Sequence, residues 1–280
     1  MAEQKNPTIR QWIDTVKPVA PWILIVAILI QFVWSPFVHF VLFPTGLLHE
    51  MRTFTGGIIH QTFFGYVILA LMTGFFICYL GGLRAKDFAM FKNKVLPAIV
   101  YIVAGWMLIQ ITPLLNGYSF EILPAWSEDG YSARKFSRFL TGQLFSNALY
   151  EELFFRGLLI SQFTLLFRKK YSMTMAIILA VICSQIIFAL GHIPHRIVNG
   201  IPLAESITRT FFYGIIFASF FLLTKNIFAT AGVHALWNAS PNIFDHSISK
   251  FGAEGLLIIL FSILLCKCIY RRYNREPKVE

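Results

Sequence analysis

The chain has 280 residues, of which 56% are hydrophobic and only 14% are charged. Soluble domains carry about 25% charged residues, so this composition excludes an ordinary soluble domain and indicates a chain surrounded mainly by lipid. The net charge of +10 would also fit a nucleic-acid partner, but the basic residues lie at the ends of apolar stretches and form no known docking motif. We therefore expect contact with the lipid bilayer and no nucleic-acid partner.

Apolar stretches follow one another along the chain, and a helix needs about 17 to 25 such residues to cross the hydrocarbon core. The long stretches cover residues 18–43, 58–80, 96–114, 139–167, 173–193 and 252–270. Two shorter stretches, 208–224 and 226–240, flank Lys225 in a pattern typical of a tight helical hairpin. We predict an all-α polytopic membrane protein, a bundle of about eight transmembrane helices.

The same pattern predicts the domain organisation. A single transmembrane domain covers residues 18–270, and it contains a motif core at 139–240. It follows a cytoplasmic N-terminal segment, 1–17, and precedes a basic cytoplasmic tail, 271–280. Most lysines and arginines fall in segments that these spans place on one side, and basic loops are retained on the cytoplasmic side. We expect an integral, multi-pass protein of a bacterial cell membrane with both termini in the cytoplasm.

Three ionisable residues, Glu151, Glu152 and Arg156, interrupt the apolar stretch 139–167. Each charge at the centre of a membrane helix costs about 2.5 to 3.5 kcal/mol on the lowest scale, so such a cluster indicates a functional site. Residues four apart share a helix face, which predicts an ion pair of Glu152 with Arg156, whereas Glu151 is rotated by about 100° and points elsewhere. The alternative is one buried network of all three that fixes helix packing. Gly157 would let a neighbouring helix approach closely.

Two further apolar stretches carry histidines. His192 follows Phe188 by one turn, near the end of a span that Pro194 terminates. His234 and Asn238 are four residues apart on a short helix, so both side chains project to the same side. Two imidazoles and a carboxylate from separate helices are the groups that water activation needs. Asn238 can donate to an oxyanion, and His234 can do so or bind a metal. The alternative is a polar seam that joins two helices.

The three motifs, Glu151-Glu152-x-x-x-Arg156, Phe188-x-x-x-His192 and His234-x-x-x-Asn238, occur in this order on successive predicted helices. In this respect the chain resembles the CPBP family of intramembrane proteases, also called the Abi family. Its members include the CAAX prenyl endoproteases and bacterial enzymes linked to bacteriocin processing and self-immunity. The resemblance covers residues 139–240, and the first three spans match only in their hydropathy.

The resemblance implies a role for each motif residue. Glu151 matches the catalytic glutamate, and His192 matches the histidine that helps it to activate water. His234 and Asn238 match the residues that stabilise the oxyanion, so that the catalytic residues lie on three or more core helices. Glu152 and Arg156 match positions whose role is largely structural.

A metal is an open question at this point. Glu151, His192 and His234 could form a three-ligand Zn²⁺ site with open coordination. The chain lacks the His-Glu-x-x-His signature of many zinc proteases. We favour a site that requires no cofactor, in which the carboxylate and an imidazole together polarise a water molecule.

The function that follows is that of an intramembrane endopeptidase of the CAAX type. It would hydrolyse a peptide bond in a membrane-embedded or lipidated protein or in a peptide precursor. The alternative is a non-catalytic membrane regulator, or a bacteriocin self-immunity protein, that has the same fold and acts through a membrane partner. A transporter that uses the buried carboxylates is disfavoured, because inverted repeats are not visible in the sequence.

Overall fold

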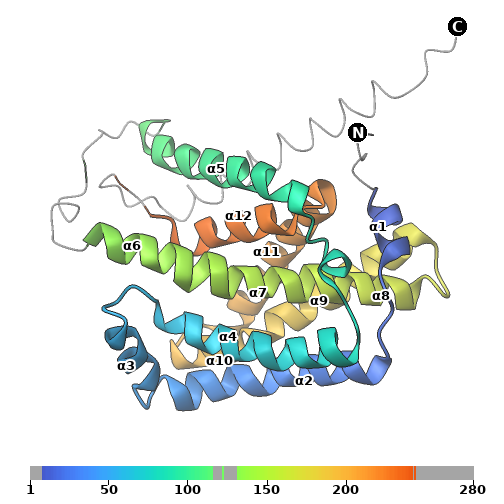
Figure 1. Cartoon of the computed structure of the whole chain (residues 1–280), viewed down its shortest axis with the longest axis horizontal. Helices are drawn as coiled ribbons and strands as arrows, with labels where there is room; N and C mark the ends of the chain where they lie inside the picture. The colour runs from blue at the N-terminus through green and yellow to red at the C-terminus, as the bar shows by residue number, and fades with distance from the viewer. Residues whose placement is uncertain (1–7, 116–121, 123–130, 242, 244–280) are drawn as a thin grey trace, which may run out of the picture.

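A computed structural model describes residues 8–115, 122, 131–241 and 243, and the regular elements of these residues are helices (Figure 1). The predicted all-α class is therefore confirmed. The predicted span 252–270 and the basic tail 271–280 lie outside the described residues.

Membrane-spanning helices are the main elements of the described chain. By length and composition, five are long and apolar enough to cross a membrane: Pro21–Leu42, Gln61–Leu80, Ala85–Ile111, Met173–Val198 and Leu203–Thr224. This confirms a polytopic membrane protein. The predicted span 139–167 lies within a continuous helical segment, 131–167, that carries the charged motif. The predicted stretch 226–240 forms a helix of 13 residues, about 20 Å long, which is too short to cross the hydrocarbon core on its own.

The N-terminal half supplies helices that pack beside the motif core. Pro21 stands at the first position of its helix, where proline fits because no backbone N–H donor is needed there. The elements are α1 (Ile9–Thr15), α2 (Pro21–Phe37) with the π-helical η1 (Val38–Leu42), α3 (Leu47–Phe54), α4 (Gln61–Gly74) with the π-helical η2 (Phe75–Leu80), the 3-10 turns η3 (Ala85–Phe88) and η4 (Lys92–Lys94), and α5 (Val95–Leu115).

The motif core begins with one long helical segment that runs through the middle of the bundle (Figure 1). Its parts are α6 (Tyr131–Phe139), the π-helical η6 (Leu140–Ala148), α7 (Leu149–Glu151), the π-helical η7 (Glu152–Leu159) and α8 (Ile160–Phe167). The two π-helical parts lie directly before and after the short α7, and π turns are frequent at functional sites. Gly157 permits the close approach that we expected, since a Cβ atom there would lie 3.2 Å from the backbone oxygen of Phe88.

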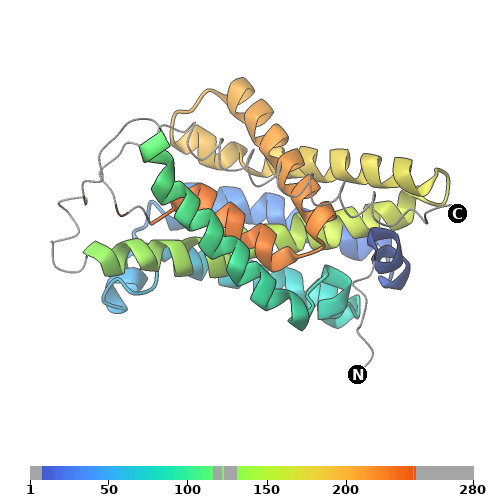
Figure 2. The same ribbon diagram turned by 90° about the horizontal axis from the view of Figure 1, so that it is seen from above.

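The remaining elements are α9 (Met173–Gly191), α10 (Ile193–Val198), α11 (Leu203–Thr224) and α12 (Ile227–Ala239) (Figure 2). Pro194 lies in the first turn of α10, and α9 ends before it at Gly191. The candidate span nevertheless continues past Pro194 to Val198, so the expectation that Pro194 terminates the span is wrong. The predicted hairpin is present. Lys225 ends α11 in the left-handed region at φ 50°, and the side chain of Asn226 begins α12 by accepting from the backbone N–H of Ala229.

Segments that we expect on the cytoplasmic side meet at one end of the bundle. The N-terminal segment packs there, with Trp12 and Ile13 buried against Phe221 and Ile227. The contacts between these segments include Trp12 Nε1 donating to the Lys86 carbonyl at 3.1 Å, Arg168 pairing with Asp14 at 2.7 Å, and Asn226 Nδ2 donating to the Lys94 carbonyl at 2.9 Å. The orientation of this end relative to the membrane remains a prediction.

Candidate active site

Glu152 and Arg156 form a buried ion pair in the middle of the long helix. Their side chains are 0% exposed, and Arg156 Nη1 lies 3.2 Å from Glu152 Oε1. Arg156 Nη2 also donates to the carbonyl of Gly214 at 3.3 Å. The guanidinium stands 4.5 Å from the ring centre of Phe188 and 5.8 Å from that of Phe217. The buried cation therefore has an anion, a carbonyl and two aromatic faces around it, which together offset the loss of water.

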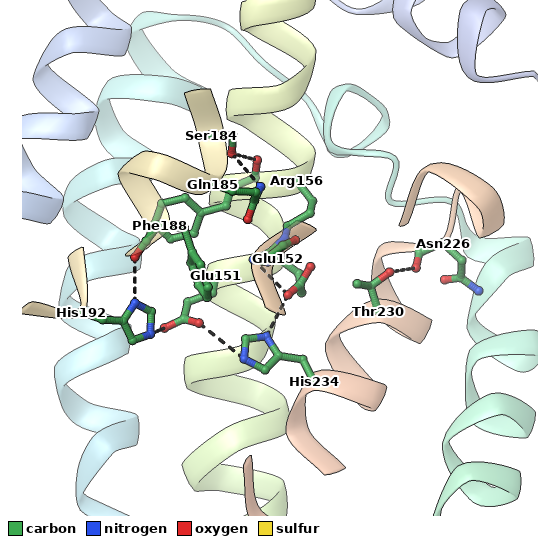
Figure 3. Close-up of polar contacts among 12 residues, drawn as sticks. Glu151, Glu152, Arg156, Ser184, Gln185, Phe188, His192, Asn226, Thr230 and His234 are labelled. Carbon is green, nitrogen blue, oxygen red and sulfur yellow. Dashed lines mark hydrogen bonds and ion pairs between the residues drawn. The ribbon is translucent and has the colours of Figure 1, made fainter. Parts of the chain in front are cut away.

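His234 connects this ion pair to Glu151. Its Nδ1 atom lies 2.8 Å from Glu152 Oε1, and its Nε2 atom lies 3.7 Å from Glu151 Oε2 (Figure 3). Its ring stacks on Phe217 at a centroid distance of 4.6 Å. The expectation that Glu151 points away from its neighbour is therefore only half right. The two carboxylates leave the helix in different directions, but they face the two nitrogens of one imidazole.

His192 approaches Glu151 from the end of α9. Its Nε2 atom lies 3.9 Å from Glu151 Oε1, and its Nδ1 atom lies 2.8 Å from the carbonyl oxygen of Phe188. A carbonyl oxygen only accepts hydrogen bonds, so Nδ1 carries a proton, and in the neutral form of the ring the Nε2 lone pair faces Glu151. The His192 side chain is 25% exposed and that of Glu151 is 5% exposed. His192 is thus the part of the cluster that is nearer the surface.

Asn238 lies beyond His234 on the same helix, and it is exposed. Its Nδ2 atom donates to Gln143 Oε1 at 2.9 Å. Asn147 Nδ2 donates to the same Gln143 oxygen at 3.1 Å. Gln143 therefore holds two amide side chains in place, and each amide keeps a second N–H. The sequence does indicate Gln143, because Gln143, Asn147 and Glu151 follow one another at intervals of four residues and so share a helix face.

Tyr66 is the other residue that the motif analysis missed. It lies on α4, outside the motif core, and its hydroxyl donates to Glu151 Oε1 at 3.1 Å. This contact could not be predicted from the sequence, because a tyrosine in an apolar stretch is ordinary. The contact depends on the packing of α4 against the long helix.

The donor types around Glu151 suit a zinc ion, because two imidazole nitrogens and a carboxylate are present and each Nδ1 atom faces an oxygen. Their arrangement does not match. Among residues 8–115, 122, 131–241 and 243, no group of three His, Cys, Asp or Glu side chains is placed to hold a metal ion.

An apolar groove of about 340 Å³ lies beside His192. It runs between α2 and the junction of α9 with α10, and Leu190, Gly191, Ile193 and Pro194 form one of its walls. The other wall comes from Phe32, Ser35 and Pro36.

Comparison with known proteins found a family model that matches the segment carrying this site. Residues 134–240 match the family model described as type II CAAX prenyl endopeptidase Rce1-like. A search of curated proteins found no match, and neither did a search of solved structures. The matched segment contains Glu151, His192 and His234 and ends two residues after Asn238. The resemblance to the CPBP and CAAX protease family is therefore confirmed over the segment that carries all three motifs.

Proposed function

We propose that this protein is an intramembrane endopeptidase of the CAAX type, in which Glu151 and His192 activate a water molecule. The observation that carries the proposal is the spacing of Glu151 from the two histidines. Its carboxylate oxygens lie 3.9 Å from His192 Nε2 and 3.7 Å from His234 Nε2. Direct hydrogen bonds measure about 2.7 to 3.2 Å. Contacts of this length suit a bridging water molecule, and the one beside His192 donates one hydrogen to Glu151 Oε1 and the other to His192 Nε2.

The first step is proton abstraction. A water molecule between Glu151 Oε1 and His192 Nε2 donates to both atoms, and its free lone pair attacks the carbonyl carbon of the substrate. Glu151 takes a proton from this water as the C–O bond forms. The tetrahedral intermediate then collapses, the C–N bond breaks, and Glu151 returns the proton to the leaving amine. General base and acid catalysis by one positioned carboxylate contributes about 10²- to 10⁴-fold to the rate.

The oxyanion of this intermediate needs hydrogen-bond donors. We assign this role to Asn238, which keeps one Nδ2–H beyond its bond to Gln143, and to His234 in its doubly protonated form. An imidazolium beside Glu152 and Glu151 gives the buried group of Glu151, Glu152, Arg156 and His234 a net charge of zero, which limits the cost of burying its charges. Glu152 then serves as the partner that orients His234.

The substrate in this proposal is a membrane-embedded or lipidated protein. The apolar groove lies beside His192 and suits an apolar chain of such a substrate, because its lining is almost entirely hydrocarbon. We expect Leu190→Trp, which narrows the groove, to raise KM for a lipidated peptide about tenfold. The unlipidated form of the same peptide serves as the control, and its KM should stay within about twofold.

The test of the proposal is proteolysis by purified protein in liposomes, together with a comparison of protein termini in cells that carry wild type or Glu151→Gln. The amide keeps the shape of the side chain but cannot act as the base, so we expect at least a 100-fold loss of cleavage with normal insertion. Cleavage at the wild-type rate by Glu151→Gln, or the same terminal peptides in both cell lines, would overturn the proposal.

A further inference from the structure

We propose that Tyr66 is a positioning residue that fixes the carboxylate of Glu151 for catalysis, an inference that rests on the proposed function. Its hydroxyl is the one side-chain group in the described part of the chain that makes a direct hydrogen bond to this carboxylate, at 3.1 Å. The two imidazole nitrogens lie farther away, at 3.9 and 3.7 Å. The orientation of the base therefore depends on a helix that lies outside the family-matched segment.

The surroundings of Tyr66 hold its ring in place. The neighbouring carbonyl of Gly65 accepts a hydrogen bond from Trp34 Nε1 at 3.1 Å, which ties α4 to α2 at this level. The ring of Tyr66 lies 5.7 Å from that of Tyr150, with an interplanar angle of 55°. A donor on a fixed backbone and a packed ring holds its acceptor more tightly than a donor on a mobile side chain.

The contact also distinguishes the two oxygens of Glu151. The Tyr66 hydroxyl donates to Oε1, the oxygen that faces His192, and Oε2 faces His234. An ionised carboxylate only accepts hydrogen bonds, so the tyrosine is the donor. Loss of this bond frees the carboxylate to rotate toward His234, and Oε1 then leaves the position from which it removes a proton from water. The consequence is a slower chemical step with little change in substrate binding.

The experiment compares Tyr66→Phe with Tyr150→Phe. The two substitutions each remove one hydroxyl from neighbouring rings that are tilted against each other, but Tyr150 donates no hydrogen bond to Glu151 among the described residues. We expect Tyr66→Phe to lower kcat about 10- to 100-fold, the range for a hydrogen bond to a charged group. KM and the melting temperature should stay near their wild-type values. The kcat of Tyr150→Phe should stay within about threefold of wild type.

A double-mutant comparison separates positioning from general packing. Glu151→Asp withdraws the carboxylate from Tyr66, so adding Tyr66→Phe to it should lower kcat less than twofold further. Wild-type kcat in Tyr66→Phe, equal losses in both tyrosine variants, or fully additive losses with Glu151→Asp would each overturn the inference. An inactive Glu151→Gln beside a fully active Tyr66→Phe rejects only the role of Tyr66, whereas an active Glu151→Gln rejects the proposed function itself.

Discussion

The Nδ1 atom of His234 lies 2.8 Å from Oε1 of Glu152, and the same oxygen lies 3.2 Å from Arg156 Nη1. One carboxylate oxygen of Glu152 thus contacts both the guanidinium of Arg156 and the imidazole of His234. The ion pair of Glu152 and Arg156 on the long helix therefore also contacts His234 of α12. A substitution of Glu152 removes a partner of both Arg156 and His234.

The first prediction concerns this shared carboxylate. Glu152→Gln leaves the charge of Arg156 buried without its partner, and we expect a loss of about 3 to 5 kcal/mol in the free energy of unfolding. The control is Glu205→Gln, which breaks an exposed pair with Arg209 at 4.0 Å and should cost less than about 1 kcal/mol. Thermal unfolding in detergent measures both variants. Equal melting temperatures for the two would contradict the prediction.

The second prediction concerns the packing beside Arg156. A Cβ atom at Gly214 would clash with Gln185 Oε1 and lie 3.1 Å from Phe188 Cδ1. We expect Gly214→Ala to destabilise the fold by about 1 to 3 kcal/mol, because both side chains must move. At Gly74 a Cβ atom would meet nothing within 4 Å, so Gly74→Ala should be neutral or slightly stabilising. Chemical or thermal unfolding of the two variants side by side tests this, and a neutral Gly214→Ala is the outcome that rejects it.

The third prediction concerns pH. Burial, followed by the positive charges of Arg52 and Arg138, lowers the pKa of His60 to about 4 from a usual 6.5. The unfolded chain therefore binds a proton below pH 6.5 that the folded chain does not bind until about pH 4, so stability falls as the pH is lowered through this range. His60→Asn keeps a cap for Thr62 and should flatten this dependence. Melting temperatures at pH 7 and pH 5 test it, and parallel losses in both proteins would refute it.

The fourth prediction concerns metal. If Glu151 and His192 activate water unaided, 1,10-phenanthroline or prolonged treatment with EDTA should leave cleavage within about twofold of the untreated rate. Elemental analysis of the purified protein should find well below one zinc per chain. Stoichiometric zinc that disappears in His192→Ala and in His234→Ala would instead establish a metal site.

The fifth prediction concerns orientation in the membrane. Lys169 lies between α8 and α9, and Ala204 lies in the first turn of α11, at the opposite end of the bundle. In a background without the native cysteines, an impermeant maleimide on intact cells should label Ala204→Cys and spare Lys169→Cys. Permeabilised cells, in which both should react, are the control. The reverse labelling would invert the topology.

The charged residues of the site could be predicted, because a charge inside a membrane raises the free energy of insertion. Glu151, Glu152 and Arg156 stand out in an apolar stretch, since each charge opposes insertion and needs a compensating partner. The pairing of Glu152 with Arg156 followed from their spacing alone. The position of His234 between two carboxylates could not be predicted, because it depends on how closely α12 packs on the long helix.

The position of Tyr66 and the burial of α1 could not be predicted from the sequence. Tyr66 is chemically ordinary for a membrane helix, and only the packing of α4 brings it to Glu151. In α1, Trp12 and Ile13 are 1% exposed within a shared apolar cluster, while the cytoplasmic location of residues 1–17 stays a prediction. A helix of seven residues is too short for its apolar pattern to predict which surface it covers.

The π-helical parts on either side of α7 have a consequence for how this protein can change over generations. A π turn holds about one residue more than an α turn. A gene that loses one codon within residues 140–148 can therefore convert one π turn of this part to an α turn and keep Glu151 directed at His192 and His234. The same deletion in a regular helix would turn the carboxylate by about 100°. The number of residues between Gln143 and Glu151 can thus differ by one among related proteins that keep the same chemistry. A sequence pattern with fixed spacing would not detect these relatives.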